Sequence, residues 1–147
     1  MTARPRLLVA LAALVVVLAI VAFLGGRSQP SRSPFTFEVD LRVSAGSYAQ
    51  LFWAGDWAFT EERSTRVPLQ PTADGFQRLR ILFPSPGIRW LRFDPTDASG
   101  EVLIRNMRVL DSNRQVLRAF DSQNLKPAHQ ILSVTQEGEV TRLVTAA

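Results

Sequence analysis

The sequence contains no cysteine and only one histidine, His129. The lack of cysteine excludes disulfides and thiolate metal sites. A single histidine cannot supply the several nitrogen ligands that zinc prefers. It lies in the loop-like segment Lys126 to Gln130, and the chain has neither a nucleophile-elbow motif nor a glycine-rich phosphate loop. The sequence therefore predicts no cofactor and no catalytic residue, and we expect a protein that is not an enzyme.

Charged and polar side chains are missing from the 18-residue run 7–24. As a helix this run would span about 27 Å, close to the hydrocarbon thickness of a bilayer. Arg4 and Arg6 before it favour a cytoplasmic N-terminus and an exported C-terminal part, although Arg27 and Arg32 after it weaken the asymmetry. A cleaved signal peptide is the alternative, but its apolar core is usually about 7–15 residues long. We expect an uncleaved, single-pass anchor in the inner or cell membrane.

The distribution of charge does not favour a nucleic-acid partner, although the sequence pI is 10.9. Three of the 17 basic residues, Arg4, Arg6 and Arg27, flank the apolar run. The other 14 stand against 13 acidic residues, all of which follow residue 28, so the exported part carries about +1 with its signs interspersed. Phosphate-binding surfaces need a clustered excess of positive charge. We therefore expect no nucleic-acid partner.

Short β-strand patterns dominate the chain from residue 35 onward. Phe35 to Val43 alternates apolar and polar residues strictly, which predicts a half-buried strand. No later segment keeps a helical period over three turns, and turn residues recur about every ten positions. Further strands are expected at 48–54, 64–70 (an edge strand, because of Pro68), 76–83, 88–94, 101–110 and 115–120, with weaker candidates at 130–135 and 139–145. The expected fold class is all-β, an antiparallel β-sandwich of jelly-roll type behind one N-terminal transmembrane helix.

The chain is expected to contain five segments. They are a cytoplasmic tail (1–6), a transmembrane signal anchor (7–24), a flexible linker rich in Gly, Ser and Pro (25–34), a β-sandwich domain (35–120) and a C-terminal extension (121–147). The extension carries one or two strands, which either complete the sandwich or begin a missing region.

Five residues form a candidate carbohydrate site: Trp53, Asp56, Trp57, Trp90 and Arg92. The C–H groups of a sugar ring stack on aromatic faces, while its hydroxyls need charged or amide partners. The alternative is structural, because large aromatic side chains usually fill the space between sheets.

Strand alternation bears on this choice. If Leu91 and Phe93 face the core, then Trp90, Arg92 and Asp94 share the opposite face. There Arg92 could pair with Asp94 and stack on Trp90, which would make these side chains a surface staple.

A loop of three acids, Asp94, Asp97 and Glu101, is a candidate calcium site, because calcium accepts carboxylate oxygens at flexible spacing. The alternative is that Asp94-Pro95 begins a turn and that the other two acids are solvated. A carboxylate pair for glycoside hydrolysis is also chemically possible, but no spacing singles out two residues among Glu38, Asp40, Asp56, Glu61, Glu62, Asp94, Asp97 and Glu101.

Four segments carry a family resemblance: YAQLFW (48–53), FTEERS (59–64), IRWLRFDP (88–95) and VLIRNMRV (102–109). In this order they resemble the extracytoplasmic, galactose-binding-like β-sandwich regions of bacterial membrane proteins of cell-surface polysaccharide synthesis, such as rhamnan-synthesis-type glycosyltransferase proteins. The resemblance covers about 35–120 and implies an accessory, glycan-related role with no catalytic residue. Such modules usually sit within long chains with many membrane spans or a transferase domain, neither of which this sequence contains.

Three functions follow in order of preference. The first is a non-enzymatic, membrane-anchored module, exposed to the periplasm or exterior, that binds surface polysaccharide or the proteins that make it. The second is a structural or protein-interaction module of an envelope complex. The third is a carboxylate-based glycosidase.

Overall fold

The computed structural model describes residues 34–146 with the exception of 57, 85–86 and 128–129. The expected tail, anchor and nearly all of the linker lie outside the described residues, as do Trp57 and His129. Within the described ranges, no helix has the length and apolar character needed to cross a membrane.

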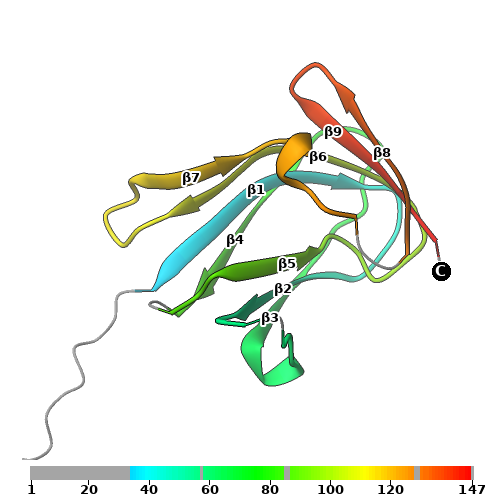
Figure 1. Cartoon of the computed structure of the whole chain (residues 1–147). Coiled ribbons are helices and arrows are strands. Elements are labelled where there is room, and N and C mark those ends of the chain that lie inside the picture. Colours follow the sequence, from blue (N-terminus) through cyan, green and yellow to red (C-terminus); the bar gives the residue numbers. More distant parts are fainter. Residues whose placement is uncertain (1–33, 57, 85–86, 128–129, 147) are drawn as a thin grey trace, which may run out of the picture. The chain divides into compact units, whose positions relative to one another are not determined.

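The described residues form two antiparallel β-sheets and no α-helix (Figure 1). The larger sheet has the order β4-β1-β6-β9-β8, with β7 also paired to β6, and the smaller sheet has the order β3-β2-β5. The strands are β1 (Phe35–Val43), β2 (Tyr48–Ala54), β3 (Ser64–Pro68), β4 (Gln77–Phe83), β5 (Trp90–Asp94), β6 (Gly100–Leu110), β7 (Val116–Phe120), β8 (Ile131–Glu137) and β9 (Val140–Thr145). Two single-turn 3-10 helices, η1 (Glu61–Arg63) and η2 (Ser122–Asn124), connect strands. The all-β, antiparallel prediction is confirmed.

The strand bounds agree closely with the sequence pattern. β1 and β2 have the predicted bounds, and the other strands differ from their predicted ranges by a few residues. Pro68 ends β3 at an edge of the smaller sheet, as expected of a residue that cannot donate a ladder hydrogen bond.

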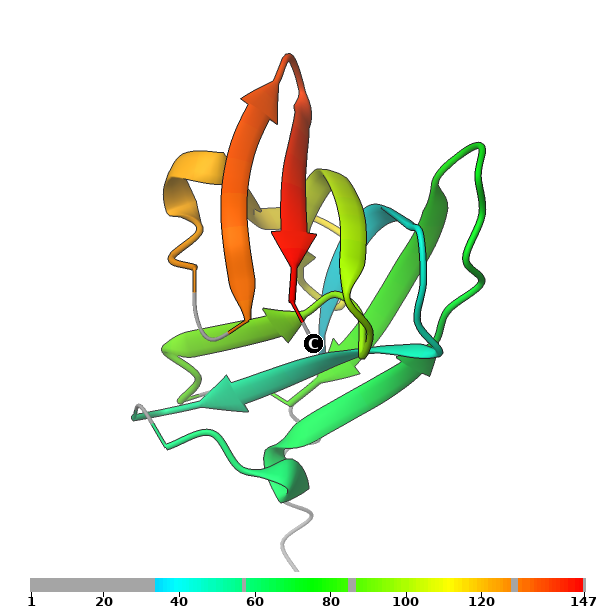
Figure 2. The same cartoon turned by 90° about the vertical axis from the view of Figure 1, so that its right-hand side faces the viewer.

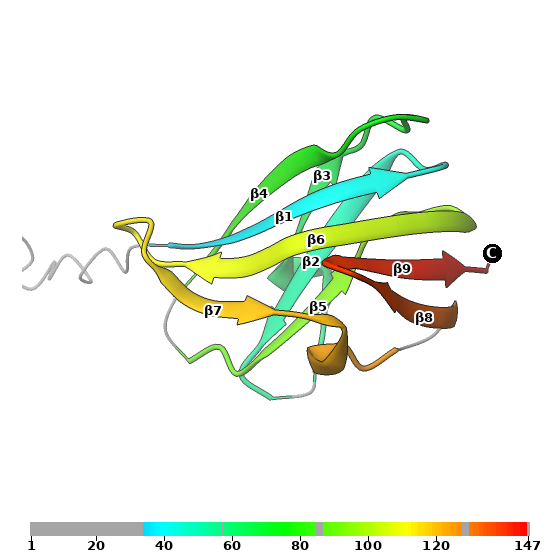
Figure 3. The same cartoon turned by 90° about the horizontal axis from the view of Figure 1, so that it is seen from above.

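One hydrophobic core joins the two sheets. It contains the inward residues of β1 (Phe37, Val39, Leu41 and Val43) together with side chains from β2, β4, β6 and β9. Figure 3 shows the strand order of the larger sheet from above, and Figure 2 shows the strands of the smaller sheet crossing below the β8–β9 hairpin. The period-two alternation of the strands therefore supplies the inner face of each sheet.

The outer face of β1 differs from the half-buried strand that the alternation predicts. Glu38 and Asp40 are only 2% and 4% exposed, so this prediction is wrong at both positions. β1 has a neighbour on each side, and arginines of β4 and β6 reach across it to cover the two carboxylates. A buried carboxylate is tolerated because it is paired and hydrogen-bonded.

Each carboxylate lies between two arginines. Nε of Arg80 donates to Oε2 of Glu38 at 2.7 Å, and Nε of Arg108 donates to Oε1 at 2.9 Å. Arg78 donates to both oxygens of Asp40 at 2.7 and 3.1 Å. Asp40 also accepts a hydrogen bond from the Asn106 amide at 2.8 Å, and Nε of Arg105 lies 3.7 Å from its Oδ2.

A β-bulge in β6 makes this arrangement possible. Glu38 lies opposite Arg108 and Asp40 lies opposite Arg105, so β6 advances three residues while β1 advances two. The extra residue is accommodated at Asn106, which has a φ of 53°. Because of the bulge, Ile104 and Met107 both face the core while Arg105 and Arg108 both face outward.

The buried carboxylates make folding stability depend on pH. The hydrogen bond from Arg80 lowers the pKa of Glu38, and the hydrogen bond from Arg78 lowers the pKa of Asp40. A carboxyl with a lower pKa in the folded state stabilises the fold above its unfolded pKa of about 4, and this contribution is lost as the pH falls through the folded value.

We expect Glu38→Gln to lower the free energy of unfolding at pH 7 by about 2–3 kcal/mol, because charge-assisted hydrogen bonds are lost. The variant should also lose less stability than the wild type between pH 5 and about pH 2. Urea unfolding at a series of pH values measures both effects. The matched control is Asp74→Asn at an exposed acid, which should change neither. A pH dependence of Glu38→Gln equal to that of the wild type would contradict the assignment.

Candidate ligand-binding cleft

The bulge divides one edge of β6 between two strands. β1 occupies the other edge, so β7 and β9 must share this one. β9 pairs with residues 100–104 and β7 pairs with residues 107–110. Arg105 and Asn106 lie between the two pairings, where the sheet opens.

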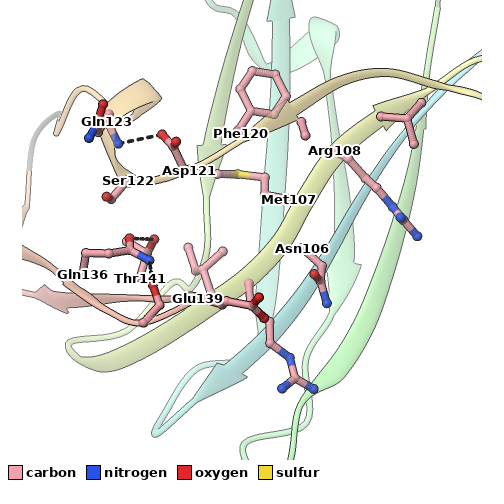
Figure 4. Close-up of a pocket in the computed structure, with 15 residues that line it drawn as sticks. Asn106, Met107, Arg108, Phe120, Asp121, Ser122, Gln123, Gln136, Glu139 and Thr141 are labelled. Atoms are coloured by element: carbon pink, nitrogen blue, oxygen red, sulfur yellow. Dashed lines mark hydrogen bonds between the residues drawn. The ribbon is translucent and has the colours of Figure 1, made fainter.

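A cleft of about 570 Å³ lies at this opening, between β7, η2 and the β8–β9 hairpin (Figure 4). Ile104, Met107 and Phe120 give it an apolar base, and these three side chains are buried or half-buried. Its polar lining comes from Arg105, Asn106, Arg108, Asp121, Ser122, Gln123, Gln136, Glu139 and Thr141.

Local hydrogen bonds fix the polar walls of the cleft. Asp121 caps η2, accepting from the backbone N–H groups of Gln123 and Asn124 at 2.9 and 3.3 Å. On the opposite wall, Gln136 accepts from the hydroxyl of Thr141 at 2.9 Å and donates to the carbonyl of Gly138 at 2.6 Å. The exposed side chains of Gln123 and Glu139 complete the rim. Pre-formed clefts with an apolar base and a few fixed polar groups are typical of ligand sites.

Of the predicted carbohydrate-site residues, the four that the structure describes (Trp53, Asp56, Trp90 and Arg92) do not line this cleft, and Trp57 lies outside the described residues. Trp53 packs against the core, and its ring stacks on Phe83 with 6.4 Å between ring centroids. Asp56 is exposed in the turn after β2, where it accepts from the backbone N–H of Ala58 at 3.2 Å. Trp90 is half-exposed on β5, opposite Ala54. Because Trp53 faces inward, it does not share a face with Arg92.

Arg92 contacts both Asp94 and Phe52 on the outer face of the smaller sheet. Leu91 and Phe93 pack against the core, as the alternation predicts. Arg92 donates to both oxygens of Asp94, at 2.9 and 2.7 Å. Its guanidinium lies 4.8 Å from the ring centroid of Phe52, so the ring that the structure places beneath Arg92 is Phe52. The expected pairing with Asp94 is confirmed.

A second network covers the same face around Gln50, which is 5% exposed. Its amide donates to Glu61 and Ser64, each at 2.8 Å, and accepts from Nε of Arg66 at 3.1 Å. Arg66 also lies over the ring of Tyr48, 4.8 Å from its centroid. The outer face of the smaller sheet is thus largely hydrogen-bonded within itself.

The three acids of the candidate calcium loop have separate partners. Asp94 binds Arg92, and Glu101 forms an ion pair with Arg142. Asp97 accepts from the backbone N–H of Ser47 at 2.6 Å, which lowers the pKa of its carboxyl, and from Tyr48 at 3.2 Å. In the part of the chain that the structure describes, no group of three His, Cys, Asp or Glu side chains is placed to hold a metal ion.

Asp97 instead joins two loops. At Gly46 the φ is +121°, and a Cβ there would lie 2.0 Å from the hydroxyl of Thr96 and 2.9 Å from Asp97. Thr96 donates to the carbonyl of Ala45 at 2.7 Å. Only glycine can be accommodated at position 46, because any side chain would collide with the loop that contains Thr96 and Asp97. The acidic loop therefore packs against the turn between β1 and β2.

One sequence signal for the cleft was present. Two polar residues, Arg105 and Asn106, stand between Ile104 and Met107, which breaks the period-two alternation of the strand. Asn is also among the residues that most readily adopt a positive φ. The walls come from loops and from the weakest predicted strands, so the pattern alone did not bring them together.

Comparison of the chain with models of protein families, with curated proteins and with solved structures finds no match.

We expect the backbone of Asn106 to prefer glycine over alanine. Asn106→Gly and Asn106→Ala both lose the hydrogen bond to Asp40, but only alanine is strained at a φ of 53°. Asn106→Ala should therefore be less stable than Asn106→Gly by about 1–2 kcal/mol in urea unfolding. The control is the regular strand position Ala119, where Ala119→Gly should be less stable than the wild type. Equal stability of the two Asn106 variants would argue against the bulge.

Proposed function

We propose that this protein is a non-enzymatic, membrane-anchored β-sandwich module that binds glycan in the cleft between β7 and the β8–β9 hairpin. The observation that carries the proposal is the cleft itself, with its apolar base and hydrogen-bonded walls. Its volume of about 570 Å³ lies within the common range of small-molecule sites, about 300–1,000 Å³.

The lining suits the mixed surface of a sugar. Phe120, which is half-buried, offers apolar surface to ring C–H groups. Amides such as Asn106 and Gln123 both donate and accept, and the carboxylates of Asp121 and Glu139 accept from hydroxyl groups. These groups bind and orient a ligand without a nucleophile–base pair.

The proposed protein is a jelly-roll, galactose-binding-like sandwich that one membrane span anchors at the cell surface. The two antiparallel sheets around one core support a jelly-roll, galactose-binding-like sandwich. The apolar run 7–24 supports a single-pass anchor with the C-terminal domain in the periplasm or outside the cell. The sandwich, the apolar run and the resemblance of four sequence segments to proteins of polysaccharide synthesis together favour a role in cell-surface polysaccharide synthesis or binding.

A second candidate is a protein-interaction module, which the free strand edges favour. Among the described residues, β7 pairs only with β6, and β8 pairs only with β9. β7 exposes Val116 and Leu117, each at 53%, and β8 exposes Leu132 at 69%. Exposed edges with apolar side chains are sites where a partner strand can add.

Glycan binding is tested with the full-length chain in a neutral detergent, first on a glycan array and then by calorimetry with the glycans that bind. Glu139→Ala and Gln123→Ala remove exposed rim groups without touching the core. Together they should weaken binding at least tenfold, because each lost hydrogen bond costs on the order of 1 kcal/mol.

The matched control is Arg92→Ala on the smaller sheet, which should leave the affinity unchanged. Loss of binding in Arg92→Ala or Trp90→Ala, with full affinity in the rim variants, would move the site to the outer face of the smaller sheet. Absence of binding to every glycan would leave the protein-interaction module as the better candidate.

Membrane anchoring is tested by alkaline extraction of membranes that contain the full-length chain. We expect the wild type to stay in the pellet, and the double variant Val16→Arg with Leu18→Arg to be released, since each central arginine costs about 2.5–3.5 kcal/mol of insertion. The control Ser31→Arg, outside the apolar run, should stay in the pellet. A mature protein that has lost its N-terminal residues would show that the run is a cleaved signal peptide.

A further inference from the structure

The outer face of the larger sheet presents a cluster of arginines, which we call the arginine face: Arg42 of β1, Arg78 and Arg80 of β4, and Arg105 and Arg108 of β6. We propose that this face binds the carboxylate or sulfate groups of an anionic glycan. The inference deepens the proposed function by naming the charge class of the ligand, and it rests on that function for the choice of a glycan.

The arginine face has more positive charge than its two acids neutralise. The five arginines and the two acids that they cover, Glu38 and Asp40, sum to a formal charge of +3, and Glu101, which lies near Arg42, is itself paired with Arg142. The side chains of Glu38 and Asp40 are 2% and 5% exposed, whereas those of the four arginines paired with them are 37–52% exposed. A ligand therefore meets the guanidinium groups and not the carboxylates.

The buried carboxylates hold these guanidiniums in place before any ligand arrives. Arg80, for example, is bonded to Glu38 through Nε, which leaves its terminal nitrogens for a ligand. Arg105 is further held over the ring of Phe76, 4.1 Å from its centroid, and Arg42 lies 5.9 Å from the same centroid. Fixing the side chains in advance reduces the entropy that binding costs.

The chemistry of the face suits small oxyanions. All but one of the 17 basic residues in the chain are arginine. A guanidinium is a planar fork that binds carboxylate, sulfate or phosphate oxygens in pairs, which an ammonium group does not do. The five arginines lie on three adjacent strands about 4.8 Å apart, so an extended polymer with repeated charges can contact several of them at once.

The position of the face favours a glycan over a lipid surface. Arg105 and Arg108 belong to the arginine face and also line the cleft, so one chain can occupy both. The carboxylates of Asp121 and Glu139 make the cleft suitable for neutral hydroxyl groups, and the charged groups of the ligand then fall on the arginine face. Leu82, exposed at the β4 edge, is the one exposed large apolar side chain of the described β4, β1 and β6 strands, whereas a membrane-binding face usually inserts several.

The test measures binding of the full-length chain, in a neutral detergent, to polygalacturonate fragments, dextran sulfate and neutral dextran at several salt concentrations. We expect the two anionic polymers to bind and the affinity to fall as salt rises. Arg42→Gln combined with Arg80→Gln should weaken anionic binding at least tenfold, while the remote control Arg63→Gln should change it less than twofold. Urea unfolding confirms that the double variant is folded.

The outcomes separate this inference from the proposed function. If a neutral glycan binds and its affinity falls in the rim variants, but anionic polymers bind no more tightly, the arginine-face inference fails and the cleft stands. If anionic binding depends on the arginine face while no neutral glycan binds, the cleft fails and the inference stands. Equal or tighter binding to duplex DNA, or to vesicles of phosphatidylglycerol and phosphatidylcholine, would overturn the assignment to glycan.

Discussion

The two buried carboxylates of β1 constrain the whole larger sheet. Glu38 and Asp40 lie in a central strand, and their partners come from the strands on both sides. Leaving such a charge buried without its partner costs roughly 3–5 kcal/mol. A slip of β4 or β6 by one residue would move the arginines to the core face, because side chains alternate along a strand. The acid–arginine pairs therefore specify the register of β4, β1 and β6. The apolar residues on the inner face of the sheet favour the same register.

The same constraint produces the opening in the sheet. The two acids are two residues apart on β1, but their β6 partners, Arg105 and Arg108, are three apart. β6 meets both acids only by adding one residue at Asn106, and that residue reverses the alternation of the strand. The bulge bends a strand and ends its pairing, so β9 and β7 each take one half of the same edge. The cleft is thus a consequence of how the buried charges are satisfied.

The sequence predicted the inner faces well and the outer faces poorly, for a physical reason. Alternation is a local property, and it placed β1 and β2 correctly and put Leu91 and Phe93 in the core. The cover of a strand's outer face comes from residues far along the chain: the partners of Glu38 lie 42 and 70 positions away. Among the candidate site residues, Trp53 lies two positions after the buried Leu51 and therefore points to the same face of the strand. Its inward position could have been predicted from the alternation. The cleft was not readable, because it depends on two loops and a bulge that meet only after folding.

Stability and anion binding are linked through the same side chains. The arginines of the arginine face lower the pKa of Glu38 and Asp40, with the hydrogen bonds from Arg80 and Arg78 as the leading causes. Protonation of these two acids in acid would remove two negative charges and raise the formal charge of the face from +3 to +5. A sulfate-bearing ligand, which stays charged, would then be attracted more strongly, while the folded state has lost the pairs that set its register. Conversely, an anion bound beside the two carboxylates would raise the pKa of both, because the added negative charge disfavours their ionised forms. Because such a ligand would bind the folded state more tightly when the acids are protonated, the anion binding proposed above would offset part of the stability that this state loses in acid.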